Sequence, residues 1–167
     1  MYRVVVEQGN LRFSAAHFIS FAGKCERLHG HNYGVSVELE GELTADRYVF
    51  DFVALKQIMR QICDALDHRF LLPELSEDFG FKRNEDEWEI RFENRRYVLP
   101  VADVLPLPVD SITAERLAEY ICDRLIAALG EYDVSNLTAI TIGVEEAPGQ
   151  TAFYRHPLSS SPSSRNS

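Results

Sequence analysis

The chain has 167 residues, of which 46% are hydrophobic and 26% charged, and its formal net charge at pH 7 is −9. These values fit a globular protein, and we expect one domain, because a chain of this length buries about two-thirds of its unfolded surface. The negative charge argues against general binding to nucleic acid or anionic lipid, which requires a basic surface. No apolar run approaches the roughly 20 residues that span a bilayer, so we expect no membrane partner.

The amino-terminal segment MYRVVVEQGNLRF lacks the basic head and the small-residue cleavage site of a secretion signal. Three cysteines, an odd number at wide spacing, suggest free thiols in a reducing compartment. We therefore expect a cytoplasmic protein. Cys63 and Cys122 fall on the apolar faces of expected helices and are interpreted as core residues.

Two strands are expected first. Residues 2–18 read as a long strand with an irregularity at residues 9–10, and His17 ends it. After a loop, residues 31–42 alternate again and are predicted to pair with the first strand.

Two helices follow. Asp51 can cap a helix whose apolar residues recur at helical spacing as far as Leu66. Thr113 can cap a second helix, Glu115 in its first turn complements the helix dipole, and Gly130 is a natural stop.

The segment NLTAITIGVEE alternates as a strand, and TAFYRH forms another after a turn at Pro148-Gly149. The order ββααββ predicts an α+β fold with an antiparallel four-stranded sheet and two helices on one face. We expect one domain over residues 1–157, with an insert at about 73–110 that contains a hairpin turning at residues 93–95. Residues 158–167 are expected to form a disordered tail.

Three histidines are the candidate metal ligands. Strand spacing puts His29 and His31 on one side, and His17 ends the neighbouring strand. Three neutral imidazoles suit Zn2+ and leave the fourth tetrahedral position open, which is typical of a catalytic site.

Cys25 has two possible roles that the residues alone leave open. It could be a fourth ligand, which would close the site and make the zinc structural. Alternatively it is a general base, since Lys24 and Arg27 flank it and would favour a thiolate.

Three further side chains have the chemistry of an active site. Asp67 and His68, at the end of the first helix, pair a carboxylate with an imidazole that titrates near neutrality. Glu146 continues the inward phase of its strand, where a carboxylate needs a partner such as the paired N–H donors of a guanidine-like ring edge. Glu145 has the opposite phase and is expected to face solvent.

Six fragments in order, namely FSAAH, CERLHGHNY, VFDF, LDHRFL, ITAERLA and GVEEAPGQTAFY, resemble the 6-pyruvoyltetrahydropterin synthase and 6-carboxytetrahydropterin synthase family. The resemblance implies the tunnelling fold (T-fold) and a homohexamer, a dimer of trimers with active sites at subunit interfaces. It also assigns roles to individual residues: zinc ligands His17, His29 and His31; catalytic residues Cys25, Asp67 and His68; the pterin anchor Glu146; and pocket support from Thr113 and Glu115. Lys24 and Arg27 remain candidate cations for an anionic substrate.

The implied substrate is 7,8-dihydroneopterin triphosphate, a small-molecule pterin. The compact Cys25-to-His29 spacing resembles the 6-carboxy branch, which releases acetaldehyde and triphosphate and leads to queuosine. The insert keeps the 6-pyruvoyl product as an alternative. A family variant carries glutamate in place of the cysteine and cleaves the side chain differently, and here Glu26 adjoins Cys25. A non-catalytic zinc- or pterin-binding homologue is the remaining alternative.

Overall fold

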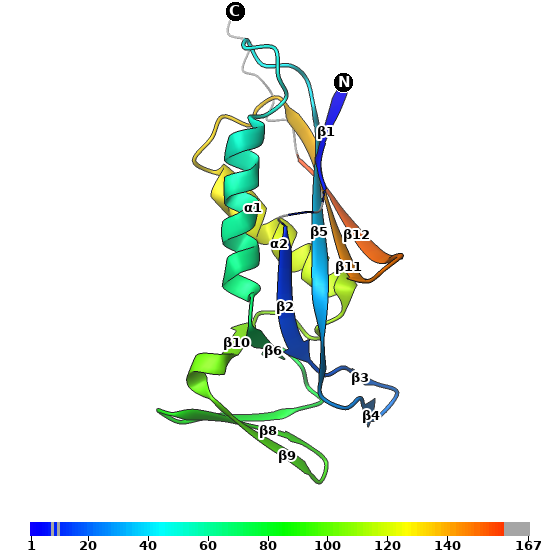
Figure 1. The fold of residues 1–167 in the computed structure, drawn as a ribbon, viewed down its shortest axis with the longest axis vertical. Helices are drawn as coiled ribbons and strands as arrows, with labels where there is room; N and C mark the ends of the chain where they lie inside the picture. The colour runs from blue at the N-terminus through cyan, green and yellow to red at the C-terminus, as the bar shows by residue number, and fades with distance from the viewer. Residues whose placement is uncertain (8, 10, 159–167) are drawn as a thin grey trace, which may run out of the picture.

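A computed structural model describes residues 1–7, 9 and 11–158. Its main sheet has seven strands in the order β10-β6-β2-β5-β11-β12, with β1 also paired to β5. Two helices, α1 and α2, cover one face of this sheet (Figure 1). The strands are β1 (Tyr2–Val6), β2 (Arg12–His17), β5 (His29–Gly41), β6 (Arg69–Pro73), β10 (Val104–Leu107), β11 (Leu137–Ala147) and β12 (Gln150–Pro157).

The expected ββααββ order and α+β class are confirmed, but the sheet is larger than the four antiparallel strands predicted. The long first strand is two strands, β1 and β2, which both pair with β5. The additional strands β6 and β10 run parallel, β6 beside β2 and β10 beside β6. Their continuous apolar runs, FLLP and VLPL, lack the alternation that identifies a half-buried strand, because β6 is buried over most of its length.

Both helices begin where the sequence predicts. The Asp51 carboxylate accepts from the Val53 N–H and caps α1 (Phe52–Leu66), and the Thr113 hydroxyl accepts from the Arg116 N–H and caps α2 (Ala114–Leu129). Gly130 is the C-cap of α2. The apolar faces of both helices pack on the sheet in one large buried cluster. Among the described residues, neither helix is long and apolar enough to cross a membrane.

The insert forms a sheet of its own from β7 (Gly80–Arg83), β8 (Glu87–Phe92) and β9 (Arg95–Pro100). The predicted hairpin is confirmed, with Glu93 and Asn94 as its turn. After the short 3-10 helix η1 (Val101–Asp103), the chain returns to the main sheet as β10, so the end of the predicted insert belongs to the core fold. The insert lies at the same end of the molecule as the small hairpin β3 (Ser20–Phe21) and β4 (Lys24–Cys25) (Figure 1).

A second buried cluster joins the insert to the main sheet. It draws on β4, β6, β10 and the insert strands, and it consists of Phe18, Cys25, Phe70, Leu72, Phe79, Trp88, Ile90, Phe92 and Val104. Cys25 is thus packed against the insert. The predicted disordered tail lies outside the described residues apart from Leu158, whose N–H donates to the Thr138 carbonyl.

Candidate metal centre and active site

The three candidate ligands come together at one end of the sheet. His17 ends β2 and is directly opposite His29, the first residue of β5, while His31 follows two residues later on the same face. One ring nitrogen from each lies within 4.8 Å of the other two. His17 is fully buried, and the other two are half-buried.

Gly30, between two of these histidines, allows β2 to approach closely. A Cβ atom at Gly30 would lie 2.8 Å from the carbonyl oxygen of Ala15, a distance that side chains do not tolerate. Because Ala15 is on β2, the glycine permits the strand pairing that brings His17 next to His29.

The hydrogen bonds of two rings fix which nitrogens are free. His17 Nδ1 lies 2.9 Å from the Ile112 carbonyl oxygen, and His29 Nδ1 lies 2.7 Å from that of Arg27. A carbonyl only accepts, so each Nδ1 carries the proton and each neutral ring presents a bare Nε2. These two Nε2 atoms are 3.1 Å apart, near the roughly 3.3 Å separation of two ligands on a tetrahedral zinc.

His31 supplies the third nitrogen. Its Nε2 is buried and has no hydrogen-bond partner among the described residues, although it lies 3.1 Å from a Glu146 carboxylate oxygen. The distance suits an ion pair, but the direction does not suit a hydrogen bond. A buried nitrogen without a partner is costly, and a metal ion would satisfy it.

His17, the buried member of the cluster, has the protonation state that metal ligation needs. Burial, together with the charges of the neighbouring His29 and His31 rings, lowers the pKa of His17 from its ordinary 6.5 to about 4. The ring is therefore neutral at pH 7, the form that binds metals. The donor set fits a catalytic metal, since the cluster contains three imidazoles and no fourth side chain among the described residues.

Cys25 is not part of the cluster of three histidines, although Glu26, the next residue, lies 3.7 Å from His29. Its Sγ points to the Glu26 carbonyl oxygen at 3.2 Å. Burial raises the pKa of this thiol above its ordinary value, and the carboxylates of Glu26 and Asp78 act in the same direction, whereas Arg95 lowers it. Lys24 and Arg27, the flanking residues predicted to favour the thiolate, are both exposed and are not among the groups that shift the pKa of this thiol.

The cation that does face the thiol, Arg95, comes from the insert. Its guanidinium donates to the backbone carbonyls of Cys25 and Glu26. No sequence signal distinguishes it from neighbouring Arg96, since the contact spans about seventy residues of chain.

Asp67 and His68 form the predicted pair. The Asp67 carboxylate accepts from His68 Nδ1 at 2.8 Å and from the Ser14 backbone N–H at 2.6 Å. The hydrogen bond from the Ser14 amide lowers the pKa of Asp67 below its ordinary value, and the hydrogen bond from His68 adds a smaller effect in the same direction. His68 has φ 54°, a conformation that non-glycine residues rarely adopt, and its own N–H donates to the Ser14 carbonyl.

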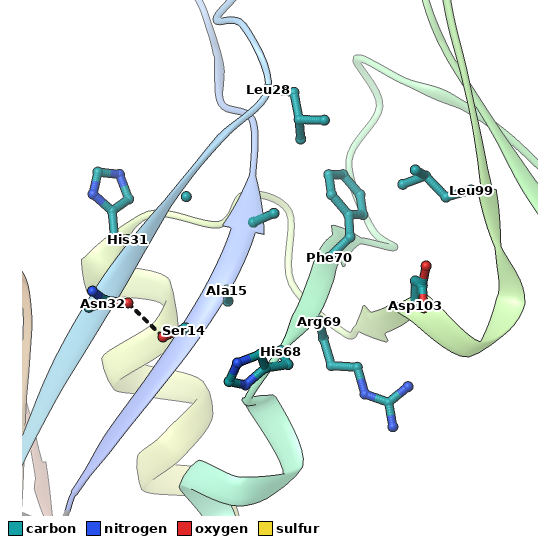
Figure 2. A pocket seen from close by; sticks show the side chains of 12 residues that line it. Ser14, Ala15, Leu28, His31, Asn32, His68, Arg69, Phe70, Leu99 and Asp103 are labelled. Carbon is teal, nitrogen blue, oxygen red and sulfur yellow. Dashed lines mark hydrogen bonds between the residues drawn. The ribbon is translucent and has the colours of Figure 1, made fainter.

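A pocket of about 640 Å³ lies between the main sheet and the insert. His31 and His68 both border it, together with Ser14, Asn32 and Arg69. Figure 2 shows the His31 ring pointing away from the His68 ring, with β2 between them. The single chain therefore does not bring the Asp67-His68 pair onto the histidine cluster.

The remaining residues of the predicted site lie around the histidine cluster or on the surface. Glu146 lies beside His31, in the inward phase that its strand predicts, and its charge contributes to raising the pKa of buried Tyr33. Glu145 instead accepts from the Gly149 N–H at the adjoining turn. Thr113 caps α2 next to the Ile112 carbonyl that binds His17, and Glu115 is exposed.

Comparison with known proteins gives one consistent family. The family model described as 6-pyruvoyl tetrahydropterin synthase matches residues 8–157. A putative 6-carboxy-5,6,7,8-tetrahydropterin synthase from Methanocaldococcus jannaschii is 39% identical over 149 residues, covering 89% of this chain and 91% of the relative. The 6-carboxy-5,6,7,8-tetrahydropterin synthase of Bacillus subtilis is 30% identical, covering 87% of this chain and 82% of the relative.

The crystal structure of 6-pyruvoyl tetrahydropterin synthase from Plasmodium vivax superimposes with a TM-score of 0.90 at 34% identity, covering 94% of this chain and 98% of that one. Variant structures of the Plasmodium vivax protein replace a glutamate, described as a catalytic residue, with alanine or cysteine. The predicted family resemblance and fold are confirmed by these matches.

Proposed function

Because the chain belongs to the 6-pyruvoyl tetrahydropterin synthase family, we propose that it is a zinc-dependent lyase that converts 7,8-dihydroneopterin triphosphate to 6-carboxy-5,6,7,8-tetrahydropterin, acetaldehyde and triphosphate. Relatives named 6-carboxytetrahydropterin synthase cover most of the chain. The compact Cys25-to-His29 spacing also favours this product and, with it, a place in queuosine biosynthesis.

One observation carries the proposal: two bare imidazole Nε2 atoms face each other at 3.1 Å while both rings donate through Nδ1. Neutral rings in these tautomers cannot hydrogen-bond to one another, so the arrangement is stable with a cation between them. His17, His29 and His31 would hold zinc and leave one position for substrate.

When bound, the zinc makes a substrate side-chain hydroxyl more acidic. Cys25 would take the proton that starts the rearrangement; in support, the next residue, Glu26, lies 3.7 Å from His29. His68, oriented by Asp67, is the second acid and base. The thiol is buried in apolar surroundings, which would help to exclude water from the reacting carbon of a bound substrate.

Glu146 is proposed to anchor the pterin ring. Its half-buried carboxylate lies at the rim of the cluster and can accept two parallel N–H donors from the ring edge. Thr113 and Glu115 would support this pocket from the start of α2. The exposed side chains of Lys24 and Arg27 are the candidate partners of the triphosphate.

We also propose a homohexamer with active sites at subunit interfaces. The His68 side chain is 82% exposed and points away from its own histidine cluster (Figure 2). A neighbouring chain would bring such a pair to the thiol. Three unpaired cysteines agree with a cytoplasmic location.

The test is product analysis by mass spectrometry after incubation of the zinc-loaded protein with 7,8-dihydroneopterin triphosphate. We expect 6-carboxytetrahydropterin and acetaldehyde. 6-Pyruvoyltetrahydropterin would assign the chain to the alternative branch, whose name the Plasmodium vivax structure carries. No turnover by zinc-loaded protein would favour the non-catalytic homologue.

A second candidate reaction is favoured by Glu26, which follows Cys25 directly. One carboxylate oxygen of Glu26 lies 3.7 Å from His29 Nε2, so this side chain is also within reach of the metal position. In that reaction Glu26 is the base and the pterin side chain is cleaved differently. Cys25→Ala should abolish the 6-carboxy product and keep zinc, whereas Glu26→Gln should abolish only the product of the second reaction.

A further inference from the structure

The insert reaches back to the candidate thiol through one side chain. Arg95 is the first residue of β9, and its Nη2 donates to the Cys25 carbonyl at 2.7 Å while its Nη1 donates to the Glu26 carbonyl at 3.1 Å. A planar guanidinium that binds two successive carbonyls fixes the orientation of the peptide between them. That peptide carries the thiol on one side and the Glu26 carboxylate on the other.

The thiol is tied into the same group of atoms. The Glu26 carbonyl that accepts from Arg95 also accepts from Cys25 Sγ at 3.2 Å. Loss of the thiol proton would leave a negative sulfur facing a carbonyl dipole. The guanidinium bound to that carbonyl offsets this repulsion, because its positive charge lies next to the same oxygen.

The hairpin holds the arginine in place. Arg95 and Phe92 are paired across the two-residue turn, and the guanidinium carbon lies 6.0 Å from the centre of the Phe92 ring. Phe92 in turn packs in the buried cluster that contains Cys25. The insert therefore supplies both the apolar wall around the thiol, which is only 6% exposed, and a cation beside it.

We propose that Arg95 is a positioning residue for Cys25: it holds the Cys25–Glu26 backbone so that the thiol points toward the substrate position, and it stabilises the thiolate. This inference rests on the proposed function, in which Cys25 is the base. Lys24 and Arg27, the cations adjacent in sequence, do not take this part, because their side chains extend into solvent.

The test is the rate at which iodoacetamide alkylates Cys25 between pH 6 and pH 10, in zinc-loaded wild-type protein and in Arg95→Met. Peptide mass spectrometry separates Cys25 from Cys63 and Cys122, which are buried in the core. We expect Arg95→Met to lower the alkylation rate at pH 8 by about tenfold, since a nearby opposite charge moves a pKa by about one unit or more. Zinc content should be unchanged.

The matched control is Arg96→Met, because the Arg96 guanidinium pairs with half-buried Glu89 on the insert. The alkylation profile of this variant should equal that of the wild type. In turnover, Arg95→Met should lower kcat by about tenfold and leave KM within about twofold. A wild-type alkylation profile in Arg95→Met would overturn the inference.

A second variant, Arg95→Lys, tests the inference if Arg95→Met does not fold. Arg95→Lys keeps the charge and loses the double donor, so it should retain most of the alkylation rate and still lose kcat. Wild-type values of both in Arg95→Lys would refute positioning by the guanidinium. If wild-type protein converts no pterin, the proposed function fails, and alkylation still decides the role of Arg95.

Discussion

The Nε2 atoms of His17 and His29 lie 3.1 Å apart, although the N–H of each ring points at a backbone carbonyl. Two lone pairs approach this closely only around a cation. The third nitrogen, from His31, is buried and lacks a hydrogen-bond partner among the residues described. The three rings therefore form a cluster that could hold a metal ion, and the Ile112 and Arg27 carbonyls set the tautomers of His17 and His29.

The first prediction concerns metal content. Purified protein should hold about one zinc ion per chain, and His17→Ala should lower zinc affinity by at least about 100-fold, because one of three ligands is lost. Competition with a chromophoric chelator measures this affinity. His156→Ala, on β12 and outside the cluster, is the control and should bind zinc like the wild type. Equal affinities in both variants would contradict the metal site.

The second prediction separates the chemistry of His68 from its backbone. His68 has φ 54°, which asparagine and glycine adopt more readily than alanine. His68→Asn should therefore unfold at the same urea concentration as the wild type or a higher one, while kcat falls about 10²- to 10⁴-fold. His68→Ala should be less stable than His68→Asn by about 1 kcal/mol. Unchanged kcat in His68→Asn would exclude its role as an acid and base.

The third prediction concerns pH and stability. The folded protein holds the pKa of Asp67 below its unfolded value, chiefly because the carboxylate accepts from the Ser14 N–H. A depressed pKa contributes stability above the unfolded pKa of about 3.9, and this contribution is lost as pH falls through the folded value. The free energy of unfolding should therefore drop as the pH is lowered below about 4.

Asp67→Asn isolates this contribution, since asparagine keeps an acceptor oxygen and removes the titration. The variant should be less stable than the wild type by about 1 kcal/mol at pH 7, an amount reduced by the partial exposure of the group, and the gap should narrow as the pH falls below about 4. Urea unfolding followed by circular dichroism measures both values. A gap that is constant with pH would mean that Asp67 is not stabilised as a carboxylate.

The fourth prediction concerns the glycine between two ligands. In Gly30→Ala the new Cβ would meet the Ala15 carbonyl oxygen at 2.8 Å, and its three nearest neighbours are all backbone atoms of β2, so no flexible side chain can move aside. We expect a loss of about 1–3 kcal/mol in stability, together with weaker zinc binding, because His29 and His31 must shift. Gly80→Ala is the control: its Cβ would make an ordinary 3.7 Å contact with Arg91. Equal stability and equal zinc affinity in the two variants would show that the close approach of β2 to Gly30 is not required.

Local signals in the sequence were enough for much of the fold. Alternation predicted β5, β11 and β12, and caps at Asp51 and Thr113 predicted both helix starts. The parallel strands β6 and β10 were missed because a strand buried on both faces has no alternation to detect. Their pairing also depends on segments that are far apart in the chain.

The site divides in the same way. The His29–Gly30–His31 spacing and the strand end at His17 were enough to predict the cluster of three candidate metal ligands, because period-two geometry puts alternate residues on one face. Only the tertiary structure decided the surroundings of Cys25. The cation that contacts Cys25 and lowers the pKa of its thiol is Arg95, about seventy residues along the chain, whereas the adjacent Lys24 and Arg27 are exposed. Charged side chains influence a pKa over a few ångströms in space, and separation along the sequence does not show which charges lie that close.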